Sequence, residues 1–172
     1  MIKLGIIGAM ELEVETLLAQ MENKSAEIVA GSTFYEGQLS GLDVVVVQCG
    51  IGKVNAAAGA VELIRTFQPD CIISTGVAGG IDRCLKVMEV VASSHIVYHD
   101  VWCGEGNAYG QIQGMPAIFE GNKTLLDCAM ALLLFLPFFG QAAESGIREV
   151  SLFNLMAQPL LKGAFLTVVA CM

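Results

Sequence analysis

Residues 3–17, KLGIIGAMELEVETL, decide the fold class of this chain of 172 residues. The apolar run at residues 3–7 predicts a short buried strand that ends at Gly8. The residues that follow carry apolar side chains at helical spacing and acidic ones in the first turn, so they predict a helix. A strand that passes through a glycine turn into a helix is the opening element of an α/β sheet.

The order of strand and glycine turn returns twice, and a helix is predicted after the first of these two turns. Apolar strands are predicted at residues 43–48 and 71–75, and each runs into a glycine-rich turn, at residues 50–52 and 76–80. Four consecutive valines at residues 44–47 show no alternation, which is typical of a central strand covered on both faces. The sequence therefore predicts an α/β fold, in which ligands gather at the carboxyl ends of the strands.

The remaining elements complete one expected domain over residues 1–172. They are a strand at 34–38 joined through a turn at 40–42, a helix at 54–67, strands at 87–93 and 95–98, an irregular excursion at 100–122, and a helix from 123 to about 135.

Composition and charge exclude several classes of protein. The chain has 9 basic and 17 acidic residues, a net charge of −8, and is 55% hydrophobic. Disorder is excluded, and an acidic chain is unsuited to binding nucleic acid through its phosphates. Six cysteines without a C-x-x-C pair support neither a zinc nor a redox motif. The first residues do not resemble a signal peptide, so we expect a cytoplasmic protein with reduced thiols.

The last 45 residues differ from the rest. Residues 1–127 hold 7 basic and 15 acidic residues, whereas residues 128–172 hold two of each. The apolar stretch at 129–139 is short for a membrane span and predicts a buried helix, with a membrane-associated tail as the alternative. We interpret residues 128–172 as a divergent apolar tail, either truncated or altered.

Two features leave alternatives open on physical grounds. The glycine turns are either plain tight turns or the rim of a small-ligand pocket, because neither the phosphate-loop nor the dinucleotide spacing is present. Glu13 is either a helix-start glutamate or a general base that orients water.

The two histidines, His95 and His99, also allow two interpretations. They lie among residues that favour strands, so their spacing of four does not place them as a helical ligand pair. The two histidines have either a structural role or a role as metal ligands or acid–base groups.

Four segments together resemble one known family. Residues 3–17, GIGKVNAAAGA at 50–60, STGVAGGIDRCLKV at 74–87, and YHDVW with YGQIQGMP between 98 and 116 are similar to the 5′-methylthioadenosine/S-adenosylhomocysteine nucleosidases. This family belongs to the nucleoside phosphorylase superfamily, and the resemblance covers about residues 2–120.

The resemblance implies a fold and a reaction. The fold is a single three-layer α/β domain around a mixed, partly barrel-like sheet, usually as a homodimer. The reaction is hydrolysis of the N-glycosidic bond between adenine and a 5′-thioribose, in methionine salvage. The implied partner is a small-molecule nucleoside, with no metal or organic cofactor, no nucleic acid and no membrane.

The resemblance also assigns site residues. Glu13 corresponds to the glutamate that orients water. The positions that correspond to substrate-binding residues are Ala9 on the ribose side, Ile51 at the sugar and thioalkyl end, and Val77, Ala78 and Gly79 beside adenine.

One part of the family pattern is missing. The family places a carboxylic acid late in the chain to protonate adenine at N7, but no aspartate follows Asp127, and the only later acids are Glu144 and Glu149. The leaving-group acid therefore has no candidate, and we expect this chain alone to be weakly active or inactive.

Three alternatives for function follow. They are a related futalosine hydrolase, a nucleoside phosphorylase, and a non-catalytic remnant that binds nucleosides. Glu13 favours water over phosphate as the nucleophile, because a carboxylate repels an incoming anion.

Overall fold

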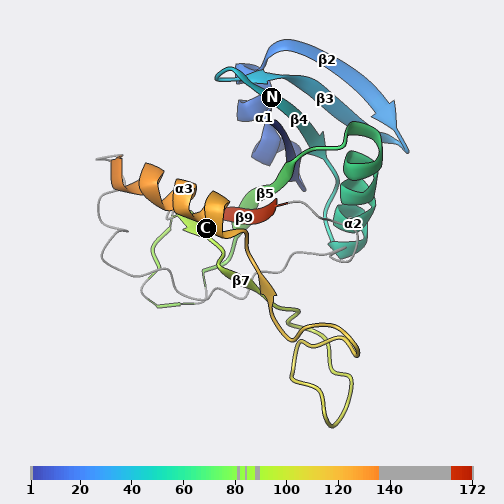
Figure 1. The fold of residues 1–172 in the computed structure, drawn as a ribbon, viewed down its shortest axis with the longest axis vertical. Helices are drawn as coiled ribbons and strands as arrows, with labels where there is room; N and C mark the ends of the chain where they lie inside the picture. Colours follow the sequence, from blue (N-terminus) through green and yellow to red (C-terminus); the bar gives the residue numbers. More distant parts are fainter. Residues whose placement is uncertain (1, 81, 84, 88–89, 136–163, 172) are drawn as a thin grey trace. The chain divides into compact units, whose positions relative to one another are not determined.

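The computed structural model describes residues 2–80, 82–83, 85–87, 90–135 and 164–171 (Figure 1). They divide into two compact units, one built mainly from residues 2–76 and the other from the described residues after Gly76, except 164–165. The expected single domain over 1–172 stays a prediction.

The first unit contains a five-stranded mixed sheet in the order β2-β3-β4-β1-β5. Its strands are β1 (Lys3–Gly8), β2 (Glu22–Val29), β3 (Ser32–Leu39), β4 (Leu42–Gln48) and β5 (Cys71–Ala78). Strand β1 runs parallel to both β4 and β5, with Gly8 opposite Gln48 and Ile7 opposite Ser74. The carboxyl ends of these three parallel strands therefore meet at one edge of the sheet.

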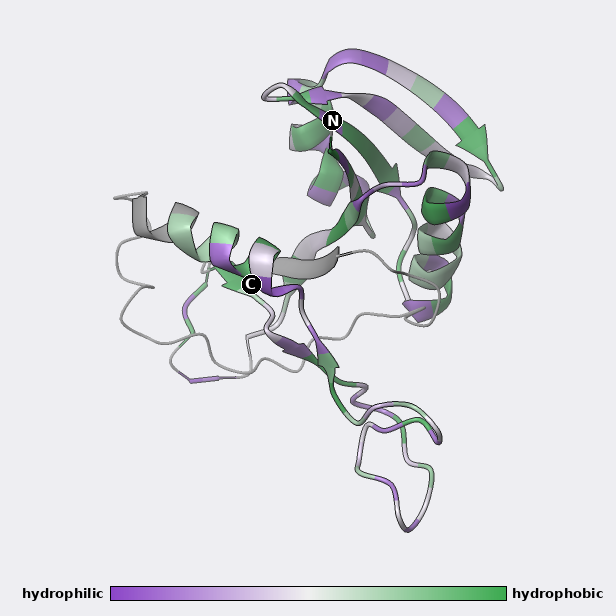
Figure 2. Cartoon of the chain, in the orientation of Figure 1, coloured by the Kyte–Doolittle hydropathy of each residue, from purple (hydrophilic) through white to green (hydrophobic). Residues whose placement is uncertain are grey.

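Helices cover both faces of this sheet. Helix α1 (Glu11–Gln20) packs on the face of Val44 and Val46, whereas α2 (Lys53–Glu62) packs on the face of Val45 and Val47. Figure 2 shows β4 in the green of hydrophobic residues. The predicted α/β class, the three layers and the strand covered on both faces are confirmed within this unit.

The α2 face holds the larger part of the core. The rings of Phe34 and Phe67 stack with centroids 4.9 Å apart, and the Leu63 side chain beside them is fully buried. The helix predicted at 54–67 is right in extent, but its last five residues, Leu63–Phe67, form a π-helical turn. Gln68 then adopts a left-handed conformation, with φ of 49°, and ends it.

Strand β2 was absent from the sequence-based prediction. Seven of its eight residues are exposed, and its sequence, ENKSAEIV, lacks an apolar alternation. The strand exists because its backbone pairs with β3, from Glu22 opposite Gln38 to Val29 opposite Ser32. Hydrogen bonding at a sheet edge leaves little trace in side-chain pattern, so only the tertiary structure shows this element.

The second unit contains short strands, one helix and a long irregular segment. Strand β6 (Val90–Ala92) pairs antiparallel with β9 (Ala164–Cys171), and β7 (His95–Ile96) pairs with β8 (Phe119–Glu120). The strands predicted at 87–93 and 95–98 are therefore shorter than expected, and β8 and β9 were not predicted. The irregular excursion is confirmed except for β8.

Helix α3 (Lys123–Phe135) has the predicted bounds. The Asn122 side-chain oxygen accepts a hydrogen bond from the Leu125 N–H at 3.0 Å and caps it. Across the described ranges, every helix is too short or too polar to cross a membrane. The expectations for residues 136–163, which include Glu144 and Glu149, lie outside the described residues.

We predict that Leu63→Ala destabilises the first unit by about 2–5 kcal/mol, because it leaves a cavity in a closed core. Leu12→Ala is the matched control, since Leu12 on α1 is 72% exposed, and it should change stability by less than about 0.5 kcal/mol. Urea unfolding followed by circular dichroism measures both. Equal losses in the two variants would contradict the packing described for the α2 face.

Candidate functional site

The Glu13 carboxylate is held by the backbone that leads into helix α1. Its Oε2 atom accepts hydrogen bonds from the N–H groups of Ala9 and Met10, both at 2.8 Å. Met10 is the N-cap and Glu13 the third helical residue, so the second bond is one half of a capping box. Glu13 is thus a helix-start glutamate whose carboxylate is fixed in place, and its role as a general base stays a prediction.

The carboxylate lies at the carboxyl ends of β1 and β5. A Cβ built on Gly76 would stand 2.5 Å from Glu13 Oε1 and 2.9 Å from its Cδ. A Cβ built on Gly8 would stand 3.6 Å from Glu13 Cβ. Glu13 and Ala9, two of the predicted site residues, therefore lie at this edge of the sheet, and their expected roles toward a substrate stay predictions. Gly76 was predicted in a glycine turn at 76–80 but lies within β5, which extends to Ala78.

Cys49 brings the end of β4 to the same edge. Its backbone N–H donates to the Gly8 carbonyl oxygen at 2.9 Å. Burial raises the pKa of the half-buried Cys49 thiol, a backbone hydrogen bond at Cys49 partly opposes this, and the negative charge of Glu13 raises the pKa further. The side chain is therefore a neutral thiol at physiological pH, which is unsuited to nucleophilic chemistry.

The turn at Gly50-Ile51-Gly52 needs its glycines. Gly50 and Gly52 have φ of 89° and 101°, a region that side chains disfavour. The Asn55 amide donates to the Ile51 carbonyl oxygen at 2.8 Å and closes the turn. The Ile51 side chain is 71% exposed, and its expected role at the thioalkyl end of a substrate stays a prediction.

Val77, Ala78 and Gly79 belong to the second unit. Val77 and Ala78 are the last, partly buried residues of β5. Gly79 is exposed, and no heavy atom lies within 4 Å of the place where its Cβ would be. Their expected role beside adenine stays a prediction.

The histidines make structural contacts. The Ser94 hydroxyl lies 3.0 Å from His95 Nδ1, and Asp100 Oδ1 lies 3.6 Å from His99 Nδ1. The Tyr109 hydroxyl donates to the His99 carbonyl oxygen at 2.7 Å. Within the described residues, no group of three or more His, Cys, Asp or Glu side chains could hold a metal ion.

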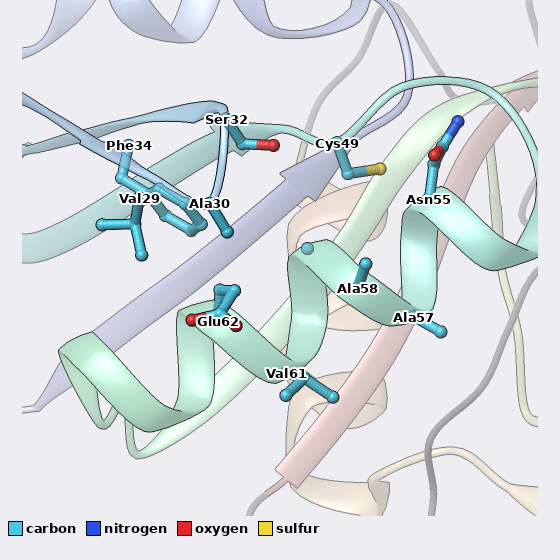
Figure 3. A pocket seen from close by; sticks show the side chains of 11 residues that line it. Val29, Ala30, Ser32, Phe34, Cys49, Asn55, Ala57, Ala58, Val61 and Glu62 are labelled. Atoms are coloured by element: carbon cyan, nitrogen blue, oxygen red, sulfur yellow. The ribbon is translucent and has the colours of Figure 1, made fainter.

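A hollow of about 380 Å³ lies between α2 and the turn that joins β2 to β3 (Figure 3). It is lined by Val29, Ala30, Ser32, Phe34, Cys49, Asn55, Ala57, Ala58, Gly59, Val61 and Glu62. None of the sequence-predicted site residues lines it. The hollow is therefore separate from the place of the Glu13 carboxylate, although Cys49 borders it.

Comparison with known proteins agrees with this fold. The profile described as "Phosphorylase superfamily" matches residues 3–152, which places the chain in that superfamily and extends past residue 120, where the recognised motifs end. The chain belongs to the 5′-methylthioadenosine/S-adenosylhomocysteine nucleosidase family within it.

Two curated relatives, both named as this nucleosidase, illustrate the similarity. The protein of Chromohalobacter salexigens is 47% identical over 128 residues, which are 74% of this chain and 54% of the relative. The protein of Listeria innocua is 46% identical over 152 residues, 88% of this chain and 64% of the relative. The chain thus spans between about half and two thirds of the length of these relatives.

Two solved nucleosidase structures resemble the fold over 99% of this chain. The enzyme of Colwellia psychrerythraea, in complex with adenine, has a TM-score of 0.87 and 33% identity, and 84% of it is covered. The enzyme of Neisseria meningitidis, in complex with methylthio-immucillin-A, has a TM-score of 0.85 and 29% identity, with 85% covered.

We predict that Glu13→Gln lowers the pKa of the Cys49 thiol. Removal of a nearby negative charge stabilises the thiolate, but the pKa stays above its ordinary value because burial is the larger cause. The measurement is the pH dependence of Cys49 alkylation by iodoacetamide, followed by peptide mass spectrometry. Glu11→Gln, on the exposed side of the same helical turn, is the control and should leave the profile unchanged. An unchanged profile in Glu13→Gln would contradict the proximity of the two groups.

Proposed function

We propose that this chain binds 5′-thio-substituted adenine nucleosides and that Glu13 directs water at the sugar. The observation that carries the proposal is the Glu13 carboxylate, fixed by two N–H groups at the carboxyl end of parallel strands. Ligands of α/β sheets bind at the carboxyl ends of the strands, which is where this carboxylate lies. The names of the relatives add the substrate class, 5′-methylthioadenosine and S-adenosylhomocysteine.

The reaction is a hydrolysis. The bond between C1′ and N9 breaks, its electron pair goes to adenine, and the sugar becomes oxocarbenium-like. A water oxygen bonds to C1′, and Glu13 takes one proton from that water as general base. Adenine must gain a proton, which makes it a better leaving group.

The proton donor to adenine is the missing part. The sequence after Asp127 offers only Glu144 and Glu149 as acids, and neither stands in the family's motif. General acid catalysis contributes roughly 10²–10⁴-fold to such a rate. We therefore propose that the 172-residue chain alone hydrolyses its natural substrate slowly or not at all.

A second candidate function is nucleoside binding without turnover. The same lack of a matching acid favours it, because Glu13 and the predicted adenine positions Val77, Ala78 and Gly79 all precede Asp127 in the sequence. Hydrolysis is preferred over phosphorolysis, since the Glu13 carboxylate would repel phosphate. A futalosine hydrolase shares the chemistry and differs in substrate.

We further propose that two copies of the chain associate, in the cytoplasm. Large apolar side chains are exposed in both units, among them Val54 at 83%, Trp102 at 60% and Tyr109 at 68%. Aromatic side chains such as Trp102 and Tyr109 are enriched at protein interfaces. Among the cysteines of the described residues, Cys49, Cys71, Cys103 and Cys128 are free thiols, in keeping with a reducing compartment.

We predict that an activated substrate restores turnover. A p-nitrophenyl 5-methylthioriboside releases a phenolate that needs no proton, so the chain should hydrolyse it roughly 10²–10⁴-fold faster than 5′-methylthioadenosine. Glu13→Gln should lower this rate by a similar factor, because the base is still required. Release of nitrophenol and adenine measures both reactions, and neither rate should depend on phosphate.

Calorimetry with adenine and 5′-methylthioadenosine separates the alternatives. Binding without turnover of either substrate would favour the nucleoside-binding function. Turnover of methylthioadenosine at an ordinary rate would contradict the proposed lack of an acid, and neither binding nor turnover would overturn the whole proposal.

The proposed association predicts a sedimentation coefficient of a dimer at micromolar concentration. Replacement of Trp102 by Glu should shift the equilibrium toward the monomer, because a charge at an apolar interface is costly to bury. A monomer at all accessible concentrations would contradict the proposal.

A further inference from the structure

Gly76 faces the Glu13 carboxylate so closely that no side chain fits between them. The place of a Cβ on Gly76 lies 2.5 Å from Oε1, 2.9 Å from Cδ and 3.3 Å from Oε2. The three nearest atoms all belong to Glu13. Distances below 3.0 Å require one of the partners to move, so an alanine at this position and the present place of the carboxylate exclude each other.

The backbone itself does not demand glycine here. Gly76 is not among the residues of the described part of the chain that have a positive φ, in contrast to Gly50 and Gly52. Gly76 sits within strand β5, in backbone that other residues adopt. The need for a missing side chain therefore comes from its neighbour Glu13 and not from a turn.

If position 76 carried a side chain, the Glu13 carboxylate is the group that would move. It is the far end of a flexible side chain, whereas the opposing atoms at position 76 belong to a strand of the sheet. Rotation of the Glu13 side chain would relieve the clash at little cost to the fold. That rotation would also break the two hydrogen bonds that Oε2 accepts from the N–H groups of Ala9 and Met10, both at 2.8 Å.

We propose that Gly76 is a positioning residue for the hydrolysis: its bare backbone keeps the Glu13 carboxylate in the one orientation that two backbone N–H groups define. Any side chain at position 76 displaces the carboxylate and leaves the rest of the first unit in place. The catalytic consequence rests on the proposed function, but the structural consequence does not.

The test compares Gly76→Ala in the natural sequence with Gly76→Ala in a protein that also carries Glu13→Ala. Gly76→Ala should speed hydrogen exchange of the Ala9 and Met10 amides roughly tenfold, the factor that loss of a hydrogen bond to a charged acceptor implies. Glu13→Ala should do the same, and Gly76→Ala added to Glu13→Ala should cause no further change. The Glu13 amide, which donates to the Met10 carbonyl oxygen at 3.1 Å, should keep its exchange rate in Gly76→Ala.

Glu11→Ala is the matched control in the same helical turn and should leave the Ala9 and Met10 amides unchanged. With the p-nitrophenyl substrate, Gly76→Ala should lower kcat to the level of Glu13→Gln while KM changes little. The double variant Gly76→Ala with Glu13→Gln should be no slower than Glu13→Gln alone.

Two outcomes would overturn the proposal. One is unchanged exchange at Ala9 and Met10 in a folded Gly76→Ala protein. The other is loss of folding in Gly76→Ala that persists when Glu13 is also alanine, because the glycine would then serve the strand. Rescue of folding by Glu13→Ala would support the proposal. Altered exchange in a protein that hydrolyses neither substrate would support the positioning and contradict only the proposed function.

Discussion

The parallel alignment of β1 with β4 and β5 is the constraint on which the site depends. It brings Gly8, Cys49 and Gly76, which are far apart in the sequence, to one edge of the sheet. The hydrophobic run of β4 holds this alignment, because its valines pack against helices on both faces. Without that core, the chain would bring no second strand end beside the Glu13 carboxylate.

At the Glu13 carboxylate, a structural hydrogen bond and the proposed chemical role use one geometry. Its hydrogen bond with the N-cap N–H starts helix α1, and the same bond prevents the side chain from rotating. A positioned base gains from such fixation, since little reorganisation remains for the reaction. The neighbouring Cys49 thiol stays neutral, because burial and the negative charge of Glu13 raise its pKa. Of these two side chains at the edge of the sheet, Glu13 therefore carries the charge.

The fold class and the main elements of the first unit were accessible from hydrophobic pattern. Strand β1, helix α1, the valine strand and the bounds of α3 all follow from apolar spacing and glycine turns. Strand β2 was not accessible, because an exposed edge strand is stabilised by backbone pairing with β3 and carries few apolar residues. The π-helical turn at Leu63–Phe67 also leaves no mark in composition, since its register is set by packing of Leu63 and Phe67.

The sequence by itself determined that the chain forms an α/β sheet with glycine turns at strand ends, and it identified Glu13 through a family resemblance. Both depend on local residue type and spacing, which a sequence states directly. Only the tertiary structure decided that two backbone N–H groups hold Glu13 and that Gly76 stands against it. These contacts join residues up to 63 positions apart, Glu13 and Gly76, and such distances are set by strand register and packing.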